Sequence, residues 1–257
     1  MKRLLARLLG FNSLEERLQN LEGSVQSAIP TLRQQIEDVE SRMLESQDSL
    51  RKRSKQRWVS ATPGIGLTWG RKLSGEAFVD KALSNVSLSE ASPILELGPG
   101  YGRITKAFLG RGLPFERYLA VDLSQNVVEH LRSEILDSRV EFRQGEIEDL
   151  RGSGQFELIW SALTFKHIYP SIEKALASLA ECLAPNGRVI FDLIEGQKRY
   201  FEPDGDTFIR HYSREEVTSF LQSAGLELIA FDSVQHDPES IESCRLLAVA
   251  GPITGDS

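Results

Sequence analysis

Short apolar runs alternate with helical patterns from Pro93 to the end of the chain, and this alternation limits the fold more than any other feature. The expected strands are 94–97, 117–121, 139–142, 156–160, 188–193, 226–232 and 245–250, and the expected helices are 102–110, 124–137, 171–183 and 213–225. Such alternation predicts a parallel sheet covered by helices on both faces. The last two strands have no helix between them, which predicts an antiparallel hairpin at the edge. We therefore predict an α/β fold with a seven-stranded, mostly parallel sheet.

Residues 14–50 follow a heptad pattern instead. Apolar positions recur at alternating four- and three-residue steps in two series: Leu14, Leu18, Leu21, Val25, Ala28, and then Ile29, Leu32, Ile36, Val39, Met43, Ser46, Leu50. The two registers change next to Pro30, which predicts a stutter, a kink or a break between two helices. This stripe predicts an N-terminal coiled coil that joins chains into a homo-oligomer. A helical hairpin packed on the main domain is the alternative.

Both ends of this helical segment are basic. Residues 1–11 (MKRLLARLLGF) place leucines on one side of a helix and Lys and Arg on the other. Such a helix suits either an anionic membrane surface or docking on a protein. The basic cluster 51–57 is expected to end the helical pattern. The expected domains are 1–57 for the amphipathic helix and coiled coil, 58–92 for a linker and cap helix, and 93–257 for the α/β domain.

Charge and cysteine content exclude several classes of protein. The chain has a formal net charge of −7, and residues 58–257 carry 19 Lys and Arg against 29 Asp and Glu. An acidic domain is a poor match for a phosphate backbone, so no nucleic acid partner is expected. Cys182 and Cys244 are spaced neither as metal ligands nor as a disulfide framework, and we predict no metal site. The apolar runs are too short to span a membrane, so we expect a cytoplasmic protein, with peripheral contact at the inner membrane surface left open for residues 1–11.

The first expected strand leads through three glycines, Gly98, Gly100 and Gly102, directly into a helix. Glycine lets the backbone approach a ligand closely and adopt positive φ. The spacing G-x-G-x-G, followed by Arg103, departs from the dinucleotide fingerprint G-x-G-x-x-G and disfavours NAD or FAD. Glu96, just before the first glycine, is unsuited to a pyrophosphate but suits a cationic ligand. S-adenosylmethionine is such a ligand, because it carries an ammonium and a sulfonium.

The run ELGPGYG (96–102) resembles the first motif of class I S-adenosylmethionine-dependent methyltransferases, in their small-molecule branch. Further landmarks follow in order: LAVDLS, FRQGEIEDL, FELIWSALTFKHI, LAPNGRVIF and RHYSREEVTSFLQSAGL. The resemblance covers roughly residues 90–250. It implies a Rossmann-like sheet, S-adenosylmethionine as cofactor and methyl transfer as the reaction.

The resemblance also implies the cofactor-binding residues. Asp122 ends the second strand, where the family has an acid that accepts hydrogen bonds from the ribose hydroxyls. Glu146 and Ile147 lie where the family places an acid and an apolar neighbour around the adenine. Asp is commoner at the first of these positions, and Glu148 or Asp149 could take its place. The complete implied set is Glu96, Gly98, Gly100, Gly102, Asp122, Glu146, Ile147 and Ser161.

The residues after the fourth and fifth strands bear on the methyl acceptor. No Asn/Asp-Pro-Pro-aromatic motif follows the fourth strand, which favours a small-molecule or glycan acceptor over nucleic acid. His167 is the candidate general base by position and intrinsic pKa, and a structural histidine is the alternative. The aromatic stretch 195–212 is expected either to cover the substrate or to be a structural insertion. Its candidate substrate contacts are Tyr200, Arg210 and His211.

Two other functional classes stay open at this stage. One is a non-catalytic cofactor-binding or scaffold protein assembled through its coiled coil. The other is an NAD(P) oxidoreductase on a related sheet, which Arg103 and the missing third glycine oppose. The sequence does not reveal the acceptor or its attacking atom.

Overall fold

The computed structural model describes residues 2, 3, 5, 11–64, 73–150, 152–240 and 243–253. The chain divides into two compact units, Met1–Leu50 and Arg51–Ser257. The division lies before the basic cluster 51–57, which the sequence assigned to the N-terminal segment. That cluster is therefore part of the globular unit.

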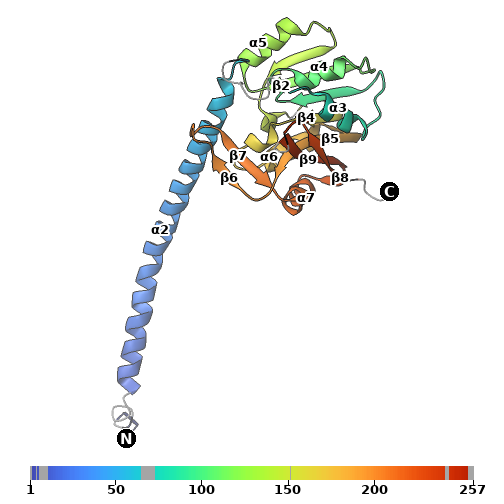
Figure 1. Ribbon diagram of the computed structural model, residues 1–257. Helices are drawn as coiled ribbons and strands as arrows, with labels where there is room; N and C mark the ends of the chain where they lie inside the picture. The colour runs from blue at the N-terminus through green and yellow to red at the C-terminus, as the bar shows by residue number, and fades with distance from the viewer. Residues whose placement is uncertain are drawn as a thin grey trace. The chain divides into compact units, whose positions relative to one another are not determined.

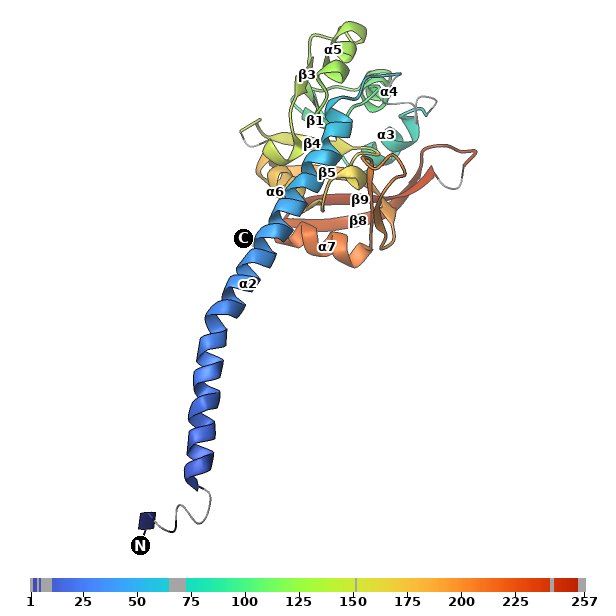
Figure 2. The same ribbon diagram turned by 90° about the vertical axis from the view of Figure 1, so that its left-hand side faces the viewer.

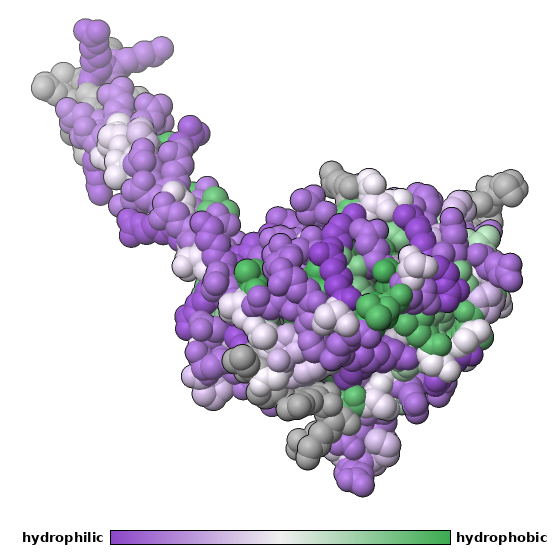
Figure 3. All heavy atoms as spheres, turned by 90° about the horizontal axis from the view of Figure 1, so that it is seen from above, coloured by the Kyte–Doolittle hydropathy of each residue, from purple (hydrophilic) through white to green (hydrophobic). Residues whose placement is uncertain are grey.

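Helix α2 extends from Phe11 to Val59 and includes Pro30. Because it is one continuous helix, the break and the hairpin that the sequence left open are not formed. The large apolar side chains of the expected heptads are 43% to 63% exposed in the single chain: Leu14, Leu18, Leu21, Val25, Ile29, Leu32, Ile36, Val39 and Met43. In Figure 3 the N-terminal helix is largely hydrophilic, with a few hydrophobic residues at its surface. Self-association stays a prediction.

The expected amphipathic helix of residues 1–11 lies largely outside the described residues, so its contacts are not addressed. Among the residues that the structure does describe, none of the helices combines the length and apolar character of a membrane span.

The globular unit is built on one sheet. Its strands are β1 (Pro93–Leu97), β2 (Arg117–Asp122), β3 (Val140–Gln144), β4 (Phe156–Ser161), β5 (Leu183–Glu195), β6 (Arg199–Phe201), β7 (Phe208–Tyr212), β8 (Leu226–Gln235) and β9 (Cys244–Pro252). The order β3-β2-β1-β4-β5 is parallel throughout, and β9 and then β8 continue it in antiparallel pairing. These strands confirm the predicted mostly parallel sheet, and Figure 2 shows β8 and β9 side by side.

The hairpin of β6 and β7 is an addition that the sequence analysis missed. It occupies the stretch 195–212, and β7 pairs in parallel with the end of β5, next to the β9 pairing. Within the described residues this makes nine strands instead of the seven predicted. β5 is long enough to pair with β4 and β9 and also, through its last two residues, with β7.

Helices cover both faces of the sheet, as the alternating pattern predicts (Figure 1). On one face pack α3 (Glu76–Leu83), α4 (Arg103–Leu109) and α5 (Gln125–Glu134), and on the other α6 (Glu173–Cys182) and α7 (Arg214–Ser223). Ser213 caps the start of α7, since its hydroxyl accepts a hydrogen bond from the Glu216 amide. Both apolar layers are buried, which fixes the strand ends relative to one another.

One carboxyl group lies inside this core. Glu96 is 1% exposed and alternates along β1 with Leu95 and Leu97, so it faces the α4 side of the sheet. Its carboxylate accepts hydrogen bonds from the hydroxyls of Tyr118 and Thr105. Burial raises the pKa of Glu96 to about 7, and the two hydrogen bonds offset only part of this rise.

This raised pKa predicts a pH dependence of stability. In the unfolded chain Glu96 ionises near its ordinary value of 4.5, whereas in the folded protein it ionises only near 7. Its contribution to the free energy of unfolding is thus fully present below pH 4.5 and is lost as the pH rises to about 7. We expect Glu96→Gln to flatten the decline of stability across that window, measured by urea unfolding. The exposed Glu227→Gln is the matched control, and identical pH profiles for both variants would contradict the assignment.

Candidate active site

A pocket lies at the carboxyl ends of β1, β2, β3 and β4, where the parallel strands leave the sheet. In open α/β sheets this edge binds ligands, at the point where the strand order reverses. Here the order reverses between β1 and β4, since β2 and β3 follow on one side of β1 and β4 and β5 on the other. The walls are the glycine loop after β1, the loops after β2, β3 and β4, and residues 54–61 at the end of α2.

The glycine loop forms one wall of the pocket. Gly98 has φ of 64°, Gly100 of 54° and Gly102 of 69°, a region that side chains disfavour. The Gly98 amide donates to the Val121 carbonyl at 2.8 Å, which ties the start of the loop to β2. Gly98 and Gly100 line the pocket. Gly102 does not line it, and a Cβ there would meet the Leu131 side chain at 2.7 Å, so its role is close packing.

Asp122 ends β2 beside this loop. Its Oδ2 accepts a hydrogen bond from the Gly100 amide at 3.3 Å, and its Oδ1 accepts one from the Ser124 amide at 2.9 Å. Burial raises the pKa of Asp122 to about 6, and the backbone amides limit the rise. At neutral pH the carboxylate is therefore mainly ionised, and each oxygen has acceptor capacity left for a ligand.

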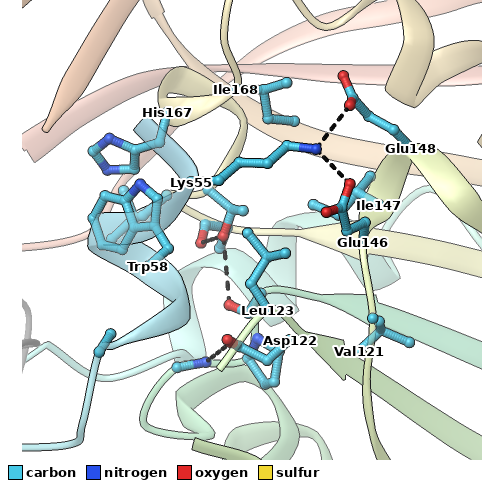
Figure 4. A pocket seen from close by; sticks show the side chains of 18 of the residues that line it. Lys55, Trp58, Val121, Asp122, Leu123, Glu146, Ile147, Glu148, His167 and Ile168 are labelled. Carbon is cyan, nitrogen blue, oxygen red and sulfur yellow. Dashed lines mark hydrogen bonds and ion pairs between the residues drawn. The ribbon is translucent and has the colours of Figure 1, made fainter. Parts of the chain in front are cut away.

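The acids after β3 are paired with the end of α2 (Figure 4). Lys55 forms ion pairs with Glu146 and Glu148, the second at 3.3 Å, and Arg51 pairs with Glu148 at 3.2 Å. Glu148 is the more enclosed of the two acids, with 12% of its side chain exposed against 46% for Glu146. Its Oε1 is buried and has no hydrogen-bond partner among the described residues. Ile147 lines the pocket between them.

His167 lies on the opposite wall, next to the ring of Trp58 (Figure 4). The ring centroids are 4.4 Å apart and the planes meet at 45°. Nδ1 contacts the Phe208 carbonyl at 2.8 Å, so Nδ1 carries the proton and Nε2 carries the lone pair. Burial is the main reason that the pKa of His167 falls to about 3, and the Lys166 charge adds to the effect. The imidazole is thus neutral at physiological pH.

A buried pair supports the loop that carries His167. Leu163 has φ of 63°, an unusual value for a residue other than glycine. Its amide donates to Oδ1 of Asp192 at 2.6 Å, and Oδ2 of Asp192 contacts Nε2 of His236. Asp192 and His236 are 1% and 3% exposed. These contacts hold the loop after β4 in a conformation that it would not adopt alone.

The structure does not bring all predicted site residues to the pocket. Glu96 lies in the core, and the Ser161 hydroxyl donates to the Leu97 carbonyl at 2.9 Å, so neither side chain lines the pocket. The three candidate substrate residues also lie outside the pocket lining: Tyr200, Arg210 and His211. Arg210 instead forms an ion pair with Glu216, and the Tyr200 ring lies 6.2 Å from that of His211.

Sequence reasoning missed the contribution of α2. It placed Trp58 in a linker and Lys55 in a solvated helix end, whereas both line the pocket. The sequence pattern that could have indicated this wall is Trp58 directly after the basic cluster 51–57. That pattern does not indicate which loop the tryptophan contacts. Among the described residues, no group of three or more His, Cys, Asp or Glu side chains could hold a metal ion.

The fold and the pocket define a Rossmann-like α/β domain with a ligand site at its strand ends. Residues 94–187 match the family model described as a methyltransferase domain. Over 109 residues the chain is 32% identical to the malonyl-[acyl-carrier protein] O-methyltransferase of Priestia megaterium, an alignment that covers 42% of this chain and 39% of that protein. The protein of the same name from Acetivibrio thermocellus is 30% identical over 98 residues, or 38% and 34% of the two chains. The chain thus matches well under half the length of these relatives.

Solved structures share the fold. Burkholderia thailandensis 1,6-didemethyltoxoflavin-N1-methyltransferase superposes with a TM-score of 0.60 and 20% identity, over 72% of this chain and 81% of that one. The glycopeptide N-methyltransferase MtfA superposes with a TM-score of 0.57 and 17% identity, over 71% and 96%. The sequence match is thus to a methyltransferase domain over residues 94–187, and these solved structures share the fold of the α/β part of the chain.

The glycine loop allows a direct test of the packing. A Cβ at Gly98 would clash with the Thr164 side chain, whereas one at Gly112, which also has positive φ, meets nothing within 4 Å. We expect Gly112→Ala to cost about 1 to 2 kcal/mol of unfolding free energy through backbone conformation. Gly98→Ala should cost about 1 to 3 kcal/mol more, because it adds the steric overlap. Urea unfolding of the two variants measures both free energies. Equal losses of stability would show that the Thr164 side chain moves aside without cost.

Proposed function

We propose that the protein transfers a methyl group from S-adenosylmethionine to a small-molecule or glycan acceptor. The observation that carries the proposal is the convergence of Gly98, Gly100 and Asp122 on one pocket within a domain of methyltransferase sequence and fold. In this proposal Asp122 accepts hydrogen bonds from the ribose hydroxyls, and the backbone of the glycine loop faces the rest of the cofactor. Glu146, Ile147 and Glu148 surround the adenine.

The chemistry of the pocket supports such a ligand. Three buried polar atoms of its lining residues have no hydrogen-bond partner among the described residues: Nε1 of Trp58, Nη1 of Arg103 and Oε1 of Glu148. Buried polar atoms in native proteins are normally paired, so these two donors and one acceptor favour a polar occupant. S-adenosylmethionine offers the complementary groups: a carboxylate, an adenine amino group and ribose hydroxyls.

The residues present suit a displacement reaction. When bound, the cofactor supplies a methyl group activated by its sulfonium. The protein then has to hold the acceptor in line and to exclude water. Trp58, His167 and Ile168 form an enclosed wall suited to that task. Exclusion of water at this wall also keeps solvent from stabilising the positive charge of the cofactor, a charge that is lost when the neutral thioether leaves.

His167 remains the candidate general base of this proposal. Its Nε2 atom carries the lone pair, but a pKa of about 3 makes His167 a weak base. An acceptor atom from which no proton has to be removed fits this site better than a hydroxyl does. The names of the two curated relatives specify transfer to an oxygen of a malonyl group. We extend to this chain only the general class, an acceptor that needs no strong base.

The exposed heptad stripe of α2 favours a second element of the proposal, a homo-oligomer through residues 14–50. An apolar stripe of this length would remain in water in a single chain. Helical self-association buries it. Contact of residues 1–11 with the inner membrane surface in a cytoplasmic protein is the further part of this proposal, and it follows from their basic, amphipathic pattern.

Asp122→Asn tests the cofactor site. The substitution keeps the shape of the side chain but removes the charge, so we expect the affinity for S-adenosylhomocysteine to fall about ten- to a hundredfold. For the wild type, affinity should also fall as the pH drops through about 6, where Asp122 becomes protonated. The variant should lack this pH dependence. Titration calorimetry measures both effects, with the exposed Asp80→Asn as control; unchanged affinity would remove Asp122 from the site.

The oligomer is tested independently. Leu21 and Ile36 belong to the heptad stripe and are 63% and 57% exposed in the single chain. Replacing both with Glu should lower the mass observed by sedimentation, because charges are costly in a coiled-coil core. Gln19→Glu with Gln34→Glu adds the same charge outside the stripe and should leave the mass unchanged. A monomeric wild-type chain would refute the self-association.

A further inference from the structure

Arg103 is a charged residue of the pocket to which the proposed function has not yet assigned a binding partner. It is the first residue of α4, directly after the glycine loop, and it lines the pocket. Its backbone is closely packed, because any Cβ at Gly75 would overlap the Arg103 carbonyl. The residue is therefore held firmly at its base while its side chain reaches the cavity wall.

The Arg103 side chain is partly buried, and one nitrogen of its guanidinium lies inside the wall without a partner among the described residues. Nη1 is inaccessible to solvent and has no hydrogen-bond partner in the described part of the chain. Burial lowers the pKa of Arg103, yet an arginine stays charged in proteins. A buried cationic donor without a partner costs free energy, so its position calls for an anion that arrives from elsewhere.

The nearby acids do not fill this role. Asp192 and Glu96 attract the guanidinium from a distance. Both oxygens of Asp192 already have partners, the Leu163 amide and His236. Glu96 accepts from Tyr118 and Thr105, and burial keeps it partly protonated near neutral pH.

The other cation of the pocket is not available either. Lys55 is paired with Glu146 and Glu148, so its charge is already balanced within the wall. Arg103 is thus the pocket cation whose charge has no hydrogen-bonded counterpart among the described residues. A planar guanidinium matches a carboxylate in particular, because two parallel N–H donors can engage its two oxygens.

We propose that Arg103 is the carboxylate-binding residue of this pocket. Two ligands could bring that group: the amino-acid end of the cofactor, or a carboxylic acid as methyl acceptor. In the second case, a carboxylate oxygen attacks the methyl carbon as the carbon–sulfur bond breaks, giving a methyl ester and S-adenosylhomocysteine. No proton has to be removed, which agrees with the low basicity of His167. Both arms rest on the proposed function for the identity of the cofactor.

The test compares two ligands that differ in the carboxylate. S-adenosylhomocysteine contains the amino-acid end, and 5′-methylthioadenosine contains the same adenosine and thioether without it. If the cofactor brings the carboxylate, Arg103→Gln should weaken S-adenosylhomocysteine binding about ten- to a hundredfold in calorimetry and leave 5′-methylthioadenosine binding unchanged. Lys106→Gln, on the exposed side of the same helix, is the control and should alter neither.

If the acceptor brings the carboxylate, S-adenosylhomocysteine should bind the wild type and Arg103→Gln equally. Propionate, observed by saturation-transfer NMR with S-adenosylhomocysteine present, should then contact the wild type and not the variant. Arg103→Lys keeps the charge but loses the planar fork, so it should show an intermediate loss and serves if the Gln variant does not fold. Unchanged binding of both probes by a folded variant would overturn the proposal. Failure of the wild type to bind either nucleoside would instead refute the proposed cofactor, and propionate without nucleoside would then test Arg103 alone.

Discussion

The hydrogen bond from the Gly98 amide to the Val121 carbonyl is the contact on which the site depends. It continues the pairing of β1 with β2 beyond the last residue of β1 and so fixes where the glycine loop begins. Asp122 is the next residue after Val121, and its carboxylate then reaches the Gly100 amide. Two short interactions between neighbouring strand ends thus bring a bare backbone and a carboxylate to the same cavity, and they require no long-range side-chain network.

In the pocket beside these strand ends, charged side chains are enclosed and only partly hydrogen-bonded. Asp122 is enclosed enough for burial to raise its pKa to about 6, while Arg103 is enclosed without a hydrogen-bond partner at Nη1. Desolvated charges are costly in the empty protein, but they interact more strongly with a complementary ligand than exposed charges do. The same burial makes His167 a weak base. These groups therefore favour tight binding of a charged cofactor over proton transfer by the protein.

The sequence was sufficient for the sheet and for part of the site because both depend on local patterns. Strand–helix alternation predicts the parallel sheet, the glycine spacing predicts a ligand-binding loop at Gly98 and Gly100, and the family resemblance implies Asp122. Local patterns do not indicate which face a side chain takes. The Glu96 side chain lies in the core on the α4 side of the sheet, where it accepts from Tyr118. The Ser161 hydroxyl donates to the Leu97 carbonyl. The β6–β7 hairpin was missed because its short strands lie in an aromatic stretch without clear alternation.

The contacts of Lys55 could not be predicted, because its partner Glu146 lies 91 residues further along the chain. No periodicity links the two positions. The heptads of α2 and the pocket residue Trp58 occur on one continuous helix, although the unit boundary falls at Leu50. A truncation after residue 57, as the sequence boundary would recommend, removes Ser54 and Lys55 from the pocket wall. A truncation after Leu50 keeps them, and for this reason only the second shortened chain tests the proposed cofactor binding separately from the proposed self-association.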